Sequence, residues 1–177
     1  MLIQTRLDVS AISLGLLIAR LVVGLGIAAH GAQKLFGWFG GHGLEGTAGY
    51  LDSLGFRPGR TFATAAAVAE FGGGVLVALG FLGPIGPAVV LAVMLVAMTQ
   101  HWSNGFFSMN GGIELPLLYA TAGVALAFTG PGAYSLDAAL GLTGLSTPTV
   151  ETVVIILAVL GAAGSLAARR SASAASR

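Results

Sequence analysis

Cysteine and charge are the two features that this 177-residue sequence lacks most clearly. It contains no cysteine, which excludes disulfides, thiolate metal ligands and thiol nucleophiles. Only 8% of its residues are charged, whereas a soluble domain carries roughly 25%. Because so few charges cannot cover a water-exposed domain of this length, we exclude a soluble enzyme, a nucleic-acid-binding protein and a disordered chain. The net charge of +1 gives no attraction for a polyanionic partner.

Hydrophobic residues and glycine are abundant in this sequence, in contrast to charged residues. Hydrophobic residues make up 55% of the chain, and 28 residues are glycine. A membrane-spanning helix needs ~20 apolar residues, and glycine within such runs lets neighbouring helices approach closely. The sequence therefore predicts an all-α integral membrane protein, a four-helix transmembrane bundle plus a fifth C-terminal helix. The expected spans lie at about 11–30, 61–82, 84–101 and 113–130.

The domain organisation follows from these runs. Residues 1–140 form the predicted membrane domain, 141–168 a linker with the additional helix, and 169–177 a disordered basic tail. The fifth run either spans the bilayer or lies in its interface. The first run is long and has no Ala-x-Ala site after it, which favours a span over a cleaved signal peptide. We expect a multi-pass protein of the cell membrane. With five spans, the Lys and Arg residues predict an outside N-terminus and a cytoplasmic C-terminus.

Two charged residues, Arg20 and Glu70, interrupt the first and second apolar runs. A charge at mid-bilayer costs ~2.5–3.5 kcal/mol even on insertion scales. Arg20 lies ten residues before His30, and Glu70 lies ten residues after Arg60. An antiparallel hairpin would place both at one depth, so we expect a buried Arg20–Glu70 ion pair. Either the pair fixes the helix register, or Glu70 binds a ligand or exchanges a proton while Arg20 tunes it.

Other polar residues are expected at one face of the membrane. His30 and Lys34 form a helical stripe with Arg20, close in angle to a ladder of small residues, Gly24, Ala28 and Ala32. His42, His101, Asn110 and Glu114 fall at the same surface, together with Trp38, Trp102, Phe106 and Phe107. The candidate polar site comprises Arg20, His30, Lys34, Glu70, His101 and Glu114.

Simpler interpretations accompany some members of this candidate site. Lys34 could snorkel to the lipid headgroups, and Glu114 could be a first-turn carboxylate favoured by the helix dipole. The three histidines have no tight ligand spacing, so no metal site is predicted. Gly72-Gly73-Gly74 lies inside an apolar run without a preceding strand, which excludes a phosphate-binding loop.

Several ordered motifs over roughly residues 14–140 resemble the DoxX family. They are Arg20-x-x-x-Gly24, His30-Gly31-Ala32-Gln33-Lys34-Leu35-Phe36-Gly37, Leu54-Gly55-Phe56, Ala69-Glu70-Phe71-Gly72-Gly73-Gly74, Leu79-Gly80, Gly111-Gly112-Ile113-Glu114-Leu115-Pro116 and 129–137. The resemblance implies a small four-helix membrane protein, so the fifth run departs from the family. It also places Arg20, His30, Lys34, Glu70 and Glu114 at recurrent polar positions of the family. Relatives include a subunit of an archaeal thiosulfate:quinone oxidoreductase and a mycobacterial protein linking superoxide dismutase to a sulfurtransferase.

The resemblance implies a membrane subunit or scaffold of a redox-linked complex, with a quinone as the candidate ligand and membrane or soluble redox proteins as partners. The sequence shows no haem or iron–sulfur motif, so we expect no cofactor held by the chain itself and no enzyme activity on its own. A proton-coupled or small-molecule transport protein and a non-catalytic assembly factor are the alternatives. No nucleic acid is expected as a partner, and a homo-oligomer stays open.

Overall fold

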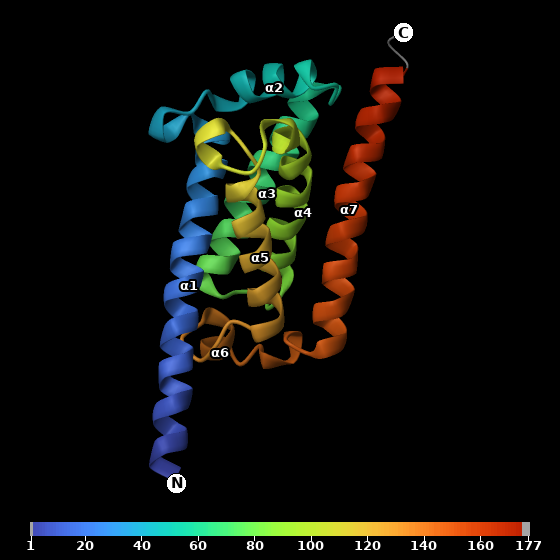
Figure 1. Ribbon diagram of the computed structural model, residues 1–177. Helices are drawn as coiled ribbons and strands as arrows, with labels where there is room; N and C mark the ends of the chain where they lie inside the picture. The colour runs from blue at the N-terminus through green and yellow to red at the C-terminus, as the bar shows by residue number, and fades with distance from the viewer. Residues whose placement is uncertain (1, 175–177) are drawn as a thin grey trace.

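The fold is a bundle of long antiparallel helices, seen in a computed structural model that describes residues 2–174. The described residues contain helices, turns and loops but no strand. The long helices (Figure 1) are α1 (Leu2–Phe36), α3 (Gly59–Leu79), α4 (Ile85–His101), α5 (Glu114–Thr129) and α7 (Pro148–Ala174). The predicted all-α architecture, a helical bundle with an additional C-terminal helix, is confirmed.

In the described part of the chain, four helical segments are long and apolar enough to cross a membrane. They are Ser10–Phe36, Gly59–Leu79, Ile85–Asn104 and Pro148–Arg169. α5 is apolar but has 16 residues, so it extends for about 24 Å at ~1.5 Å per residue. α5 packs against α4, and α7 packs against α4 and α5. The C-terminal helix is thus a full-length span candidate that lies beside the bundle.

The helix boundaries differ from the predicted spans in several places. α1 begins at Leu2, before the expected start at 11, and it continues beyond the expected end at His30 to Phe36. The predicted loop 30–60 contains a helix, α2 (Gly43–Ser53), which buries Ala48 and Leu51. α7 continues to Ala174, so 169–174 of the predicted tail are helical, and 175–177 lie outside the described residues. The predicted spans rest on long runs of apolar residues. Such runs mark the lipid-facing segments but not the short helix α2 or the polar ends of the long helices.

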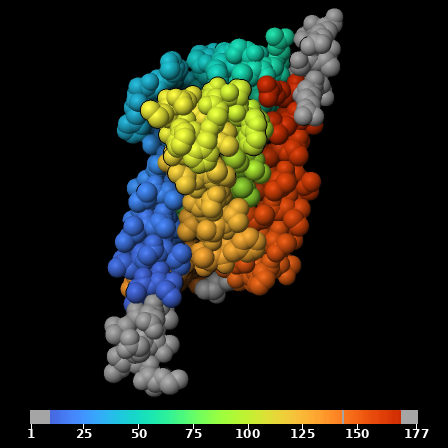
Figure 2. Space-filling model, in the orientation of Figure 1, coloured from blue at the N-terminus to red at the C-terminus, as the bar shows by residue number. Residues whose placement is uncertain are grey.

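The two ends of the bundle are built differently (Figure 1). We call the end formed by 37–58 and 102–113 the α2 end, and the end formed by 80–84 and 130–147 the α6 end, after α6 (Leu136–Leu140). In Figure 2 the segments of the α2 end cover the upper ends of the helices. The C-terminal end of α7 lies at the α2 end as well (Figure 1).

α1 and α3 pack backbone to backbone through glycine. A Cβ atom on Gly24 would lie 2.5 Å from the Ala78 nitrogen and 2.6 Å from the Gly74 oxygen. A Cβ atom on Gly74 would lie 2.5 Å from the nitrogen of Ala28. Ala28 and Ala32 are buried in the same contact. The predicted close approach along this small-residue ladder is therefore confirmed, and it fixes how α1 and α3 line up.

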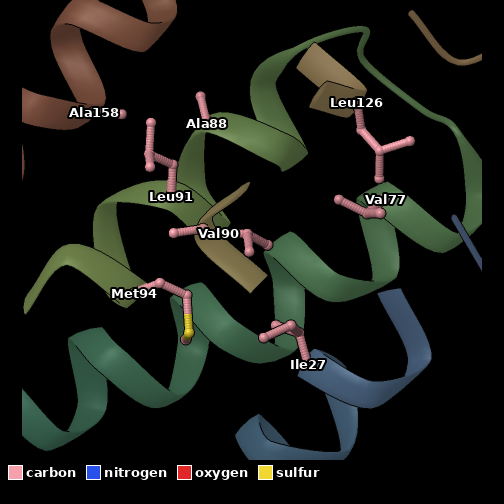
Figure 3. Packing of buried hydrophobic residues seen from close by; sticks show 9 residues of the cluster. Ile27, Val77, Ala88, Val90, Leu91, Met94, Leu126 and Ala158 are labelled. Atoms are coloured by element: carbon pink, nitrogen blue, oxygen red, sulfur yellow. The ribbon is translucent and has the colours of Figure 1, made fainter. Parts of the chain in front are cut away.

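The apolar core lies between α1, α3, α4, α5 and α7. Its buried members gather in one cluster (Figure 3), formed by Ile27, Val77, Ala88, Val90, Leu91, Met94, Ala120, Leu126 and Ala158. A second cluster packs Phe56 and Leu51 beneath α2. The outward faces of the helices carry large exposed hydrophobic side chains such as Val22, Leu118 and Leu160. Apolar groups on both sides of the helices suit a protein surrounded by lipid.

Candidate functional site

Glu70 forms an ion pair with Lys34 near the α2 end. The alignment set by Gly24 and Gly74 brings the last turn of α1 beside the middle of α3, where the Lys34 ammonium donates to Oε1 of Glu70. The Glu70 side chain is 2% exposed, whereas that of Lys34 is 33% exposed. The second carboxylate oxygen, Oε2, is buried and has no hydrogen-bond partner. Buried polar atoms are normally satisfied, so this oxygen needs an explanation.

The expected Arg20–Glu70 ion pair is wrong. Nη1 of Arg20 donates to the Ala78 carbonyl at 3.3 Å, and Nη2 donates to the Tyr134 carbonyl, both towards the α6 end. The prediction placed Arg20 and Glu70 at the same depth because each lies ten residues from an expected helix end, at His30 or Arg60. However, α1 ends at Phe36, and its glycine contacts set a different alignment with α3. Lys34, not Arg20, therefore lies at the depth of Glu70.

Arg20 belongs to a separate cluster at the α6 end, which sequence reasoning missed. The carboxylate of Asp137 accepts the backbone N–H groups of Leu82 at 2.9 Å and Gly83 at 2.6 Å. Both residues have positive φ, 63° and 54°, so their N–H groups point to one anion. Asp137 is 2% exposed and attracts the Arg20 guanidinium electrostatically. This cluster ties α1 to the 80–84 turn and the 130–147 segment. Asp137 lies within the 129–137 motif that resembles the DoxX family, and this motif is the sequence signal that could have identified it.

Two cavities meet at the Lys34–Glu70 pair. The large chamber, of about 410 Å³, lies between α2, α3, α4 and α7, and its walls are mostly apolar. Its α7 wall consists of the small residues Gly161, Ala162 and Ser165. The small chamber, of about 210 Å³, lies between α1, α4 and α5 and includes His30 and Tyr119. Both chambers are bordered by Lys34, Glu70, Ala97 and His101.

The two histidines of the candidate site lie at these chambers. His30 faces the ring of Tyr119 edge to face, with 6.1 Å between ring centroids. Nδ1 of His101 lies 2.7 Å from the carbonyl oxygen of Gly111, to which it donates. That bond leaves Nε2 as the acceptor of a neutral ring. The structure therefore brings together four of the six candidate residues, His30, Lys34, Glu70 and His101.

Glu114 and Arg20 lie apart from the chamber residues. Oε2 of Glu114 accepts the backbone N–H of Ser108 at 2.8 Å, which closes the 102–113 segment on the start of α5. Glu114 borders neither chamber. Among the described residues, no group of three His, Asp or Glu side chains is placed to hold a metal ion.

Comparison with known proteins places these features in a family. The profile of the DoxX family matches residues 15–102. The inner membrane protein YphA of Escherichia coli (strain K12) is 33% identical over 130 residues, which cover 69% of this chain and 87% of YphA. The chain belongs to the DoxX family. No solved structure matches it. The predicted multi-pass protein of the cell membrane is confirmed by the family, by this relative and by the apolar helices.

The match shows which parts of this DoxX protein are shared with the family profile. Residues 15–102 include both glycines of the α1–α3 contact and the Lys34–Glu70 pair, together with His101. α7 lies beyond the matched range, although it supplies one wall of the large chamber. The polar pair therefore lies in the part that matches the profile, and one chamber wall lies outside it.

Proposed function

We propose that this DoxX protein is the ligand-binding membrane subunit of a redox-linked complex and binds a quinone-type headgroup in the large chamber. The observation that carries the proposal is the buried Lys34–Glu70 pair at the wall of an apolar chamber between helices. A volume near 410 Å³ falls within the range of ~300–1,000 Å³ usual for small-molecule sites. Apolar walls with a few polar groups suit a flat, lipid-soluble carbonyl compound.

The residues present fit such a headgroup. An ammonium has three N–H donors, and Lys34 gives one to Glu70, so the others remain for a carbonyl oxygen. Gln100 and His101 border the same chamber and add polar groups near its α2 end. The small α7 residues Gly161 and Ala162 leave room for the ring. Lys34 would then orient the ligand, and Glu70 would hold a proton beside it.

A bound quinone would supply the electron and proton acceptor chemistry. The chain's own residues contribute binding, orientation and a protonatable group. Because the sequence has no cysteine, thiol redox chemistry would have to come from another protein. The proposal therefore includes a redox protein as partner.

A proton-coupled transporter is the second candidate, because an intramembrane carboxylate between two chambers is typical of transport pathways. Both chambers lie towards the α2 end, since both are bordered by His101. Near Arg20, the described residues enclose a cavity of only about 10 Å³. An open groove of about 880 Å³ follows α3 from Arg60 to Leu76, but Glu70 is not among the residues that line it. The geometry therefore favours binding over transport.

Binding to the large chamber is tested with a matched pair of α7 variants. A Cβ atom on either Gly161 or Gly164 would meet no other atom within 4 Å, but only Gly161 borders the chamber. Purified protein in lipid nanodiscs is titrated with a short-chain quinone by calorimetry. We expect Gly161→Leu to weaken binding at least ~10-fold, which is about 1.4 kcal/mol, and Gly164→Leu to leave it unchanged. No binding by the wild type, or equal effects of both variants, contradicts the proposal.

The partner is tested separately. The full chain is purified from native membranes in mild detergent, and the proteins that accompany it are identified and assayed for quinone-dependent electron transfer. We expect a redox enzyme whose activity in the complex falls in Gly161→Leu but not in Gly164→Leu. Recovery of no redox protein would count against the subunit role, whatever the result of the quinone titration.

A further inference from the structure

The small chamber gives Glu70 a second environment. The large chamber meets the Lys34–Glu70 pair from the side of α2, α3 and α7, whereas the small chamber is bordered by α1 and α5. The walls of the small chamber include His30, Tyr119 and the backbone of Gly111 and Gly112. At about 210 Å³ the chamber has room for several water molecules, since one water takes ~30 Å³ in the liquid.

The unsatisfied oxygen of Glu70 indicates that a proton or water belongs here. Oε2 is buried without a partner, although Oε1 accepts from Lys34. A buried acceptor that is left unsatisfied loses its bonds to water without replacement, which destabilises that state. A carboxyl group that takes up a proton at Oε2, or meets water there, avoids that loss. Glu70 borders the small chamber, so the chamber can supply both.

His101 is placed to pass that proton. Its Nδ1–H is held by the Gly111 carbonyl at 2.7 Å, which fixes the ring and leaves Nε2 free to accept a proton. The side chain is partly exposed and borders both chambers, whereas Glu70 is fully enclosed. The other titratable groups that border the two chambers together with Glu70 are Lys34 and His30 of α1, Tyr119 of α5 and Tyr50 of α2.

We infer that the small chamber is the proton-access chamber of Glu70, in which Nε2 of His101 takes a proton from water at the α2 end and passes it through chamber water to the Glu70 carboxylate. The transfer is reversible: imidazolium and carboxylate become neutral imidazole and carboxylic acid, and the ring is reprotonated from water. This inference deepens the proposed function, because Glu70 would hold the proton beside the ligand in the large chamber.

The opposite end offers no comparable access. Beyond the pair, α1 lies against α3 so closely that a Cβ atom on Gly31 would be 2.3 Å from the Phe71 nitrogen. The Gly24–Gly74 contact follows one to two turns farther towards the α6 end. The open groove along α3 and α4 does not include Glu70 among its lining residues. We therefore expect Glu70 to exchange protons with the membrane face at the α2 end.

The test measures proton exchange at Glu70 directly. The full chain in lipid nanodiscs is mixed with acidified D₂O, and the carboxylic-acid infrared band that forms as the Glu70 carboxylate takes up a deuteron is followed in time. Glu70→Gln identifies the band. His101→Asn keeps a side-chain N–H for Gly111 but removes the basic ring nitrogen. His42→Asn is the matched control, because His42 is exposed and borders neither chamber.

We expect His101→Asn to slow exchange about a hundredfold, the lower end of what a positioned acid–base group contributes, and His42→Asn to leave it unchanged. In the wild type alone, the exchange rate should depend on pH, because a neutral imidazole accepts a proton and an imidazolium gives one up. The pH dependence in the wild type tests the inference even if the His101→Asn variant does not fold.

Three results would overturn the inference: no band lost in Glu70→Gln, a pH-independent rate in the wild type, or equal rates in wild type and His101→Asn. The quinone titration is read independently. If exchange behaves as expected but no quinone binds, the proposed ligand fails and the proton-access chamber stands.

Discussion

At the scale of single residues, the two ends of the bundle use buried charge in opposite ways. At the α6 end, both carboxylate oxygens of Asp137 accept backbone N–H groups, and Arg20 donates to two carbonyls. At the α2 end, Glu70 keeps one oxygen without a partner beside two chambers. Nε of Arg20 is also buried without a partner, but the cavity beside Arg20 is only about 10 Å³. Glu70 instead borders two chambers that have room for a ligand or for water.

The Asp137 cluster should be structural, and Asp137→Asn tests this. The amide would place an N–H₂ donor against one of the N–H groups of Leu82 and Gly83 and remove the charge facing Arg20. We expect a loss of ~1–3 kcal/mol, the cost of leaving a buried hydrogen-bonding group unsatisfied, measured as a lower Tm in detergent. Glu45→Gln, which breaks the exposed ion pair with Arg60, should cost at most ~1 kcal/mol. Equal Tm changes in the two variants would contradict a structural role.

Glu70→Gln should behave differently from Asp137→Asn. Lys34 is one-third exposed, so it can stay hydrated without its partner, and the variant should fold with a Tm near that of the wild type. Quinone affinity should nevertheless fall at least ~10-fold, or about 1.4 kcal/mol, in the calorimetric titration. A large drop in Tm with unchanged affinity of the folded fraction would show that Glu70 only fixes the helix register.

At the scale of elements, the alignment of α1 and α3 decided which charges meet. The sequence located both helices and the small-residue ladder between them, because lipid-facing helices are long and apolar and their contacts need glycine or alanine. It could not give the alignment, since the end of α1 at Phe36 and the intervening α2 depend on polar residues without a strong pattern. The shared surface of His30, Lys34 and His101 was predicted; the partner of Glu70 was not.

Gly74 and Gly72 provide a test of this alignment within one helix. A Cβ atom on Gly74 would collide with the α1 backbone, whereas one on Gly72 would meet nothing within 4 Å. We expect Gly74→Ala to cost ~1–3 kcal/mol, as overpacking does. Gly72→Ala should be neutral or stabilising by up to ~1 kcal/mol, because alanine favours the helix. Thermal unfolding in detergent measures both, and similar Tm values would show that the contact does not set the alignment.

The end of α7 is fastened over the large chamber by Arg169. Its Nε donates to the Leu54 carbonyl at 2.8 Å, and its guanidinium lies 5.1 Å from the centre of the Phe56 ring. Phe56 itself borders the chamber. We expect Arg169→Ala to weaken quinone binding about threefold, since a cation–π contact contributes ~0.5–1 kcal/mol at exposed sites. Arg57 is exposed and lies next to Phe56 in the 37–58 segment, so Arg57→Ala should leave quinone affinity unchanged. Equal quinone affinities of the two variants would contradict the role of Arg169.

At the scale of the whole molecule, the few charged residues are distributed unevenly between the two ends of the bundle. Composition alone was enough to predict an all-α membrane protein, because a chain with 8% charge has few other folded states available. Of the Lys and Arg residues in the described part of the chain, Lys34, Arg57, Arg60, Arg169 and Arg170 lie at or near the α2 end. Arg20 is buried in the α6-end cluster, and Arg6 lies near the start of α1, at the opposite end from α2. By the excess of Lys and Arg on cytoplasmic loops, the α2 end should face the cytoplasm.

The absence of cysteine makes this orientation directly measurable. Ser53→Cys places a single thiol at the exposed end of α2, and Ala138→Cys places one on α6 at the opposite end. With a membrane-impermeant maleimide on intact cells, we expect Ala138→Cys to be labelled and Ser53→Cys to react only after permeabilisation. The cysteine-free wild type gives the background. The reverse labelling pattern would show the opposite orientation in the membrane. The small chamber would then take its protons from outside the cell, because His101 and the 102–113 segment lie at the same end as α2.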